Sequence, residues 1–191
     1  PGIKGISGNE LALILKEQAE DLGAEIKTIS VTEIRNTKEG KILITASEEI
    51  LCKTVILASG QVHRKLGIPG EEKLTGMGVS YCAVCDGAFF KGMDVAVVGG
   101  GSTALQDADY LSTYCNKVYL IHRRDEFRGE QHLVEVLKEK ENVEFVLNHV
   151  VTEVQGDFAV EGIRLEDKKN GEKSELKVDG GFMAVGQIPG N

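Results

Sequence analysis

The sequence lacks the features that mark membrane-spanning, secreted and nucleic-acid-binding proteins. No apolar run approaches the roughly 20 residues that a bilayer requires, and no charged-then-apolar leader precedes a small-residue cleavage site. Positive charge is in deficit, since 22 Lys and Arg stand against 30 Asp and Glu and leave a net charge of −8, which argues against nucleic acid or an anionic membrane as a general partner. With 191 residues and 41% apolar content, we expect a soluble, globular, cytoplasmic protein.

Cysteine is also scarce, and its placement excludes a secreted disulfide framework. Of the four cysteines, only Cys82 and Cys85 are close in sequence. Their C-x-x-C spacing is found in redox dithiols, in half of a zinc site and in pairs of buried cysteines. A structural zinc site needs two more ligands, and the sequence offers neither a second C-x-x-C nor a paired histidine, so a redox dithiol in a reducing compartment fits better. The adjacent Asp86 is a candidate proton donor or acceptor for the thiolates, or simply an acid near a helix N-terminus.

The first third of the sequence predicts a helix followed by a small meander. Apolar residues recur with helical spacing over 11–22, with Asn9 as a candidate N-cap and Gly23 as the stop. The strands expected after it are 25–31, 41–46 and 51–58. The last strand ends in an apolar run, Val55–Ala58, which suits a buried strand. A segment rich in glycine and charge, 61–78, then predicts a boundary between two domains.

The remainder predicts a Rossmann-like α/β domain. Strands and helices alternate with short joints, at 95–98, 102–114, 117–121, 131–140 and 143–147. Such units join parallel strands by right-handed crossovers. Three further strands, 152–155, 159–165 and 175–178, predict an antiparallel meander inserted before the last strand at 181–185. We therefore expect a parallel sheet with an antiparallel insertion.

A glycine pattern follows the first strand of this domain. Gly99-x-Gly101-x-x-Ala104 comes after four apolar residues and opens an amphipathic helix, which is the context that the dinucleotide-binding fingerprint requires. Gly99 permits the tight turn, Gly101 lets a pyrophosphate approach the backbone, and Ala104 lets the helix pack closely on the strand. The other candidate contacts are Gly100 and the two hydroxyl donors Ser102 and Thr103. The alternative is a merely structural turn.

The end of the second strand indicates which dinucleotide binds. In the NAD fingerprint an acidic residue about 20 positions on accepts the ribose 2′-hydroxyl, whereas an arginine accommodates a 2′-phosphate. Here His122, Arg123 and Arg124 begin 23 positions after Gly99 (122 − 99), Arg128 lies a turn beyond, and no carboxylate occupies the strand end. Because arginine offers paired planar donors that match phosphate, the cluster predicts NADPH. The alternative is a solvated charged loop.

A nicotinamide and a dithiol together imply a further cofactor. Hydride transfer and thiol–disulfide exchange need a two-electron relay between them, which is usually a flavin. The sequence therefore implies FAD, although its 191 residues contain no second glycine fingerprint. No metal is expected.

The most specific segments of the chain are Gly78–Gly87, Val97–Ala104 and Ile121–Arg128. Together they resemble the low-molecular-weight, bacterial-type thioredoxin reductases, in which an NADPH domain is inserted into an FAD domain. The resemblance implies that residues 1–66 are the middle of the FAD domain, 67–186 the NADPH domain with the dithiol, and 187–191 the start of the return to the FAD domain. It also implies a fragment that lacks the outer parts of the FAD domain and is inactive alone. The segment similar to the family's Ala-Thr-Gly beside the flavin is Ala58, Ser59 and Gly60.

The resemblance further implies roles and partners. Cys85 would face the flavin, Cys82 would attack the disulfide of thioredoxin or a similar small dithiol protein, and Asp86 would protonate a leaving thiolate. The NADPH domain would rotate against the FAD domain about two hinge strands, 61–66 and 185–189. The full-length protein would be a homodimer.

Three other readings stay open. The flavin subunit of alkyl hydroperoxide reductase shares the fold and the dithiol but prefers NADH, and the arginines after Ile121 speak against it. A flavin dithiol oxidase passes electrons to oxygen and needs no nicotinamide, so in such a protein the glycine turn and the arginines would have no function. The isolated chain could also be a catalytically silent nucleotide-binding module.

Overall fold

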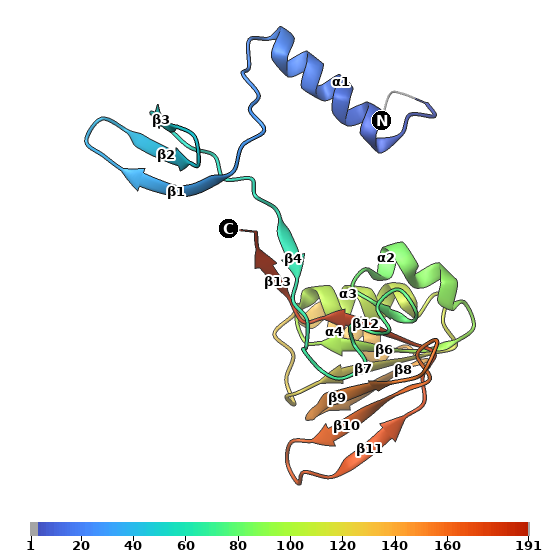
Figure 1. The fold of residues 1–191 in the computed structure, drawn as a ribbon. Helices are drawn as coiled ribbons and strands as arrows, with labels where there is room; N and C mark the ends of the chain where they lie inside the picture. The colour runs from blue at the N-terminus through green and yellow to red at the C-terminus, as the bar shows by residue number, and fades with distance from the viewer. Residues whose placement is uncertain (1–3, 191) are drawn as a thin grey trace. The chain divides into compact units, whose positions relative to one another are not determined.

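The computed structural model describes residues 4–190, and the chain divides into two compact units, Pro1–Ala58 and Ser59–Asn191 (Figure 1). The first unit holds a helix and a small sheet, and the second holds a parallel sheet together with most of the candidate site residues. Within the described residues, no helix combines the length and the apolar character that crossing a membrane demands.

The first unit confirms the predicted helix and meander. Helix α1 spans Gly8–Asp21. The antiparallel sheet has the order β1-β2-β3, and its strands are Val31–Asn36 (β1), Lys41–Thr45 (β2) and Glu49–Cys52 (β3).

The N-cap of α1 is Ser7, so the prediction of Asn9 is wrong. The Ser7 hydroxyl accepts a hydrogen bond from Glu10 N at 3.2 Å, and the Glu10 carboxylate accepts one from Ser7 N at 2.9 Å. This reciprocal capping box satisfies two N–H groups and starts the helix before Asn9. Gly23, with φ of +89°, follows the C-cap and ends the helix as predicted.

Two strand predictions in the first unit are wrong. The first strand begins at Val31 rather than at residue 25, and Val55–Ala58 forms no strand. This run is not buried either, because Ile56 and Leu57 are 92% and 70% exposed. An alternating or apolar run becomes a strand only beside another strand, and within residues 4–190 none pairs with either segment. None of residues 4–58 is buried, so the described part of this unit has no core of its own.

A five-stranded parallel sheet forms the centre of the second unit and confirms the predicted Rossmann-like α/β fold. Its order is β5-β12-β6-β7-β8, and its strands are Val79–Ser80 (β5), Asp94–Gly99 (β6), Lys117–His122 (β7), Val143–Leu147 (β8) and Gly180–Ala184 (β12). Helices α3 (Ser102–Leu111) and α4 (Gln131–Lys138) connect β6 to β7 and β7 to β8. Helix α3 stops three residues before the predicted end, because the hydroxyls of Ser112 and Thr113 donate to carbonyls of its last turn.

The two faces of this sheet carry different layers (Figure 1). Helices α3 and α4 cover one face. The antiparallel sheet β11-β10-β9 covers the other and confirms the predicted insertion, with strands His149–Gln155 (β9), Gly162–Asp167 (β10) and Lys173–Leu176 (β11). Strand β6 supplies both cores, because Val95 and Val97 pack with the helices whereas Ala96 and Val98 pack with the antiparallel sheet.

Two short strands lie where the chain enters and leaves the second unit. Strand β4 (Gln61–His63) pairs antiparallel with β13 (Gln187–Pro189), so segments 124 or more positions apart (187 − 63) lie side by side. The compact division falls between Ala58 and Ser59, which puts both strands in the second unit. The division into flavin and nucleotide domains at residues 66 and 186 stays a prediction. The remaining elements are the short helix α2 (Ala83–Asp86) and the 3-10 helix η1 (Gly87–Phe90), which follow β5.

Candidate functional site

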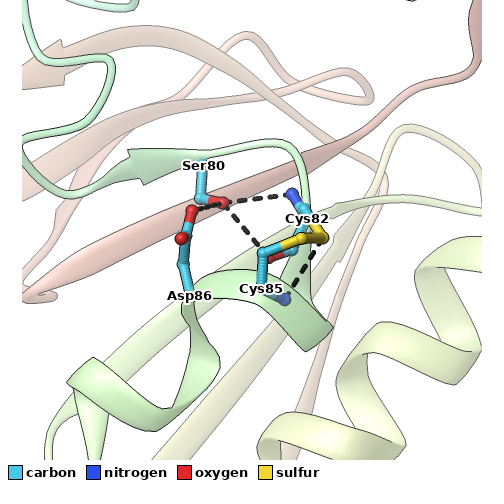
Figure 2. The surroundings of a disulfide bond; sticks show 4 residues. All are labelled: Ser80, Cys82, Cys85 and Asp86. Atoms are coloured by element: carbon cyan, nitrogen blue, oxygen red, sulfur yellow. Dashed lines mark hydrogen bonds between the residues drawn. A yellow bond between two sulfur atoms is a disulfide. The ribbon is translucent and has the colours of Figure 1, made fainter. Parts of the chain in front are cut away.

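The two cysteines of the C-x-x-C motif form a disulfide at the start of helix α2 (Figure 2). Cys82 is the N-cap residue, its Sγ accepts a hydrogen bond from Cys85 N at 3.2 Å, and the two Cα atoms lie 5.3 Å apart. Cys85 is exposed, whereas Cys82 is partly buried. The tight first turn of the helix therefore brings the two sulfur atoms together and leaves one of them open to solvent.

Asp86 lies at the other end of α2 and is joined to the dithiol segment by Ser80. The Ser80 hydroxyl donates to Asp86 Oδ2 at 2.6 Å, and its oxygen accepts a hydrogen bond from Cys82 N at 3.1 Å (Figure 2). Asp86 is half-buried and Ser80 is buried. The predicted acid thus directly follows Cys85 in the chain, and its carboxylate is held by one defined hydrogen bond to Ser80.

A buried carboxylate, Glu71, links the residue before Cys82 to the segment after β4. Its side chain is 1% exposed and accepts hydrogen bonds from Leu66 N at 2.9 Å, Gly67 N at 2.7 Å and the Tyr81 hydroxyl at 3.0 Å. Burial, and next the hydrogen bond to Glu71, raise the pKa of Tyr81 to about 12. The Tyr81 ring also stacks on the ring of His63, with centroids 5.5 Å apart.

The glycine turn after β6 is closely packed on one side and open on the other. A Cβ on Gly99 would lie 2.7 Å from Ala104 Cβ, and one on Gly100 would overlap the His122 ring. A Cβ on Gly101 would meet nothing within 4 Å. None of the three has a positive φ. Close approach of neighbouring groups, rather than left-handed backbone, therefore requires glycine at the first two positions, and Gly101 leaves free space at the N-terminus of α3.

A cavity of about 570 Å³ opens at this turn and brings together most of the predicted dinucleotide contacts. The predicted residues that line it are Gly99, Gly100, Gly101, Thr103, His122, Arg123 and Arg128. The cavity also extends to Tyr81, so one wall of it is the residue that precedes the dithiol. A cavity of this volume, with several cationic side chains on its wall, suits an anionic ligand of dinucleotide size.

Three predicted residues near the turn do not line this cavity. The Ser102 hydroxyl accepts a hydrogen bond from Glu130 N at 3.3 Å, Ala104 packs on Gly99, and the Arg124 carbonyl accepts one from Asn148 N. The first of these contacts holds the loop after β7 against the start of α3, and the last joins that loop to the residue between β8 and β9. The proposed flavin segment, Ala58 to Gly60, is exposed and is not part of the cavity either.

His122 occupies a different environment from the arginines that follow it. Its ring is 6% exposed, stacks on Phe127 with centroids 5.1 Å apart, and packs against Gly100. Burial holds the pKa of His122 below its ordinary value, and the charges of the neighbouring arginines act in the same direction. His122 therefore supports the turn as a neutral ring, whereas Arg123 and Arg128 are exposed at the cavity.

Several functional candidates escaped the sequence-based search. Arg64, Lys65 and His149 add cationic or titratable side chains to the cavity, and Ser80 and Glu71 orient the dithiol segment. Arg64 and Lys65 could have been identified from the sequence, because they lie in a charged segment next to the predicted domain boundary. Ser80 and Glu71 could not have been identified from the sequence, because their roles depend on hydrogen bonds that the tertiary structure creates.

The fold and the site define a class of protein, an α/β domain that combines a Rossmann-type glycine turn with a C-x-x-C disulfide. The chain belongs to the pyridine nucleotide-disulphide oxidoreductase family, whose model matches residues 3–191.

Several thioredoxin reductases are similar to this chain over nearly its whole length. The chain is 43% identical over 190 residues to a thioredoxin reductase of Mycolicibacterium smegmatis, over 99% of this chain and 61% of that protein. It is 41% identical to a thioredoxin reductase of Bacillus subtilis (strain 168), over 99% and 60%. The crystal structure of Lactococcus lactis thioredoxin reductase in its FR conformation matches with a TM-score of 0.76 and 38% identity, over 99% of this chain and 63% of that one. A thioredoxin reductase from Giardia duodenalis matches with a TM-score of 0.78 and 32% identity, over 98% and 62%. The chain thus spans about three fifths of the length of the relatives it matches.

Proposed function

We propose that the chain is the nucleotide-binding and dithiol-bearing part of an NADPH-dependent thioredoxin-disulfide reductase. The observation that carries the proposal is the presence, in one compact unit, of the Cys82–Cys85 disulfide and of a cavity at the glycine turn with arginines on its wall. Family membership and the thioredoxin reductases among its relatives support the same function. The reaction is reduction of a disulfide in thioredoxin or a similar small dithiol protein.

NADPH is the dinucleotide that the cavity fits best. Gly101 leaves free space at the first turn of α3, where the backbone N–H groups and the positive end of the helix dipole favour a pyrophosphate. Arg123 and Arg128 line the cavity beyond the end of β7 and can pair with a 2′-phosphate. Strand β7 ends in His122 rather than in the carboxylate that would accept a ribose 2′-hydroxyl, which disfavours NADH.

The family implies FAD as the second cofactor, and we assign to this chain only part of its site. A flavin, when bound, carries two electrons between the nicotinamide and the dithiol. The contact proposed from this chain is Ala58, Ser59 and Gly60, which form an exposed segment. Residues 1–66 and 187–191 would belong to the flavin domain. The complete protein is proposed to be a cytoplasmic homodimer, as composition and resemblance suggest.

The dithiol would carry the electrons to the protein substrate. In the reduced pair, Cys82 would attack the substrate disulfide and Cys85 would resolve the mixed disulfide and exchange electrons with the flavin. Asp86, which lies at the other end of the same short helix, would supply the proton that the leaving thiolate takes up. The hydrogen bonds that link the Asp86 carboxylate through Ser80 to the backbone of Cys82 support this assignment.

The test is calorimetric titration of the chain with NADPH and with NADH, together with an absorption spectrum for bound flavin. We expect NADPH to bind more tightly than NADH. Arg123→Ala or Arg128→Ala should weaken NADPH binding roughly tenfold and leave NADH binding nearly unchanged, because each removes a phosphate partner. Arg124→Ala is the matched control, since it removes the same charge from a residue that does not line the cavity. Equal losses for both dinucleotides would contradict the 2′-phosphate assignment.

The main competing function is that of an NADH-linked flavin subunit of alkyl hydroperoxide reductase. It shares the disulfide and the glycine turn, so the same titration separates the two. Equal or tighter binding of NADH by the wild-type chain would favour it over the thioredoxin-disulfide reductase.

A further inference from the structure

Ser80 is hydrogen-bonded both to Cys82, which belongs to the disulfide, and to Asp86, the proposed acid. It is the last residue of β5, two residues before Cys82, and its side chain is 5% exposed. Its hydroxyl contacts both the backbone of Cys82 and the carboxylate of Asp86, which lies six positions further on (Figure 2). A buried serine that bonds to a carboxylate on a helix only four residues long determines where that carboxylate lies.

The direction of the hydrogen bonds follows from the single proton of the hydroxyl. Asp86 Oδ2 is 2.6 Å from Ser80 Oγ, whereas the Cys82 carbonyl is 3.4 Å away, so the proton goes to the carboxylate. The lone pairs of Ser80 Oγ then accept from Cys82 N at 3.1 Å. Among residues 4–190, neither another side chain nor a backbone N–H donates to the Asp86 carboxylate, so Oδ1 has no protein partner there and is free to exchange a proton.

We propose that Ser80 is a positioning residue for Asp86 in thiol–disulfide exchange. It binds Oδ2 and ties the acid to the backbone of Cys82, so that acid and cysteine keep their relative position when the disulfide opens. The role deepens the proposed function and rests on it, because it concerns the acid of the same reaction.

Ser80 assists an exchange in which electrons and protons pass from the reduced cysteine pair to the substrate disulfide. One thiolate of the reduced pair attacks a sulfur of the substrate disulfide, a new S–S bond forms, the substrate S–S bond breaks, and the leaving thiolate takes a proton from the acid form of Asp86. The second thiol of the pair, after losing its proton to the Asp86 carboxylate, attacks the first cysteine sulfur in the mixed disulfide. The Cys82–Cys85 bond forms, the mixed S–S bond breaks, and the second substrate sulfur leaves as a thiolate that takes this proton from Asp86. The pair loses two electrons and becomes the Cys82–Cys85 disulfide, and the substrate gains two electrons and two protons as two thiols.

The experiment measures this exchange with oxidised glutathione as the substrate, so it needs neither dinucleotide nor flavin. The chain is reduced with dithiothreitol, desalted and mixed with oxidised glutathione between pH 5 and 9. Acid quenching and mass spectrometry of the peptide that contains Cys82 and Cys85 then report the rate for that pair alone. The variants are Ser80→Ala, Asp86→Asn, the double variant, and Ser80→Thr, which keeps the hydroxyl. Ser112→Ala is the matched control, because it removes a partly buried hydroxyl that bonds elsewhere.

Ser80→Ala is expected to slow the exchange roughly tenfold and to change its pH profile in the same way as Asp86→Asn, since a misplaced acid contributes little. The double variant should be no slower than Asp86→Asn alone, Ser80→Thr should recover most of the rate, and Ser112→Ala should match the wild type. A merely structural serine would instead lower the melting temperature and leave the pH profile unchanged.

Two outcomes would overturn the proposal. The first is an unchanged rate and pH profile in Ser80→Ala. The second is a double variant whose loss equals the product of the two single losses, because Ser80 would then act independently of Asp86. Neither result depends on NADPH, so failure here is distinct from failure of the dinucleotide titration.

Discussion

The Tyr81 hydroxyl donates a hydrogen bond to Glu71 across 3.0 Å, and the same carboxylate accepts the backbone N–H groups of Leu66 and Gly67. Tyr81 immediately precedes Cys82, and Leu66 follows β4 by three residues (66 − 63). One buried side chain therefore connects the segment that enters the second unit with the segment that carries the dithiol. The Tyr81 ring lines the cavity of the glycine turn, so this connection also borders the proposed dinucleotide site.

Removal of the Glu71 carboxylate should lower the stability of the folded protein. Glu71→Ala leaves three hydrogen-bond donors without the buried carboxylate that they share, and we expect it to lower the free energy of unfolding by about 3 kcal/mol. Tyr81→Phe removes one of the three bonds and should cost about 1 kcal/mol. The measurement is urea unfolding followed by circular dichroism. Glu72→Ala is the control, because its exposed pair with Lys65 should contribute under about 1 kcal/mol. Similar losses at positions 71 and 72 would contradict this account.

Two adjacent glycines of the turn should respond differently to alanine. In Gly100→Ala the new Cβ overlaps the buried His122 ring, so we expect a loss of about 2 kcal/mol in stability. In Gly101→Ala the Cβ enters open space, so stability should change by under about 1 kcal/mol while NADPH affinity falls at least about tenfold. Chemical unfolding and calorimetric titration of both variants measure the two effects. If the Gly101→Ala variant bound NADPH as tightly as the wild type, the proposed position of the pyrophosphate at this turn would be wrong.

Asp107 on α3 should make stability depend on pH. Burial raises its pKa from 3.8 to about 6, so above pH 7 the folded state holds a carboxylate that is partly removed from water. Asp107→Asn should therefore raise the free energy of unfolding at pH 8, by about 1 kcal/mol after allowance for partial solvent exposure.

The sign of this effect follows from proton uptake. As the pH falls through 6 the folded state takes up a proton before the unfolded state does, which stabilises the wild type relative to the variant. The difference between the two proteins should narrow between pH 7 and 5 and close only below about pH 4. Urea unfolding at pH 8.0, 6.5 and 5.0 measures it. An Asp107→Asn variant that is less stable than the wild type at pH 8 would show instead that the carboxylate has a favourable ionic partner.

Cys115 should be nearly inert to alkylation in the folded protein. Burial, and next the charge of Asp94, raise the pKa of its thiol to about 11, and its side chain is 6% exposed. At pH 8 only about one thiol in a thousand is then ionised. With the Cys82–Cys85 disulfide intact, iodoacetamide should label the half-buried Cys52 at least about a hundredfold faster than Cys115. Peptide mass spectrometry over a time course measures both rates, and labelling in urea should abolish the difference.

Much of the second unit could be predicted because its elements have local boundaries. Strand β6 is a continuous apolar run that ends in glycine, and α3 begins directly after it, so the βαβ unit was readable without any knowledge of its neighbours. In the first unit the run Val55–Ala58 has an equally good strand pattern, yet it forms no strand. Apolar character is a property of the segment, whereas a ladder also needs a partner, and within residues 4–190 none lies beside this one.

The sequence by itself determined the motifs on which the proposed chemistry rests. The dithiol of Cys82 and Cys85, the glycine turn and the arginines after β7 are contiguous signatures, because a spacing of two to five residues follows directly from the geometry of one turn or one helix start. The tertiary structure decided which of those residues act together. It placed Arg123 and Arg128 at the cavity and Arg124 outside it, turned His122 into a support for the turn, and brought Ser80 onto Asp86 and Glu71 onto Tyr81. Such relations depend on how separate segments pack, and a hydrogen bond between them exists only once both are buried in one arrangement.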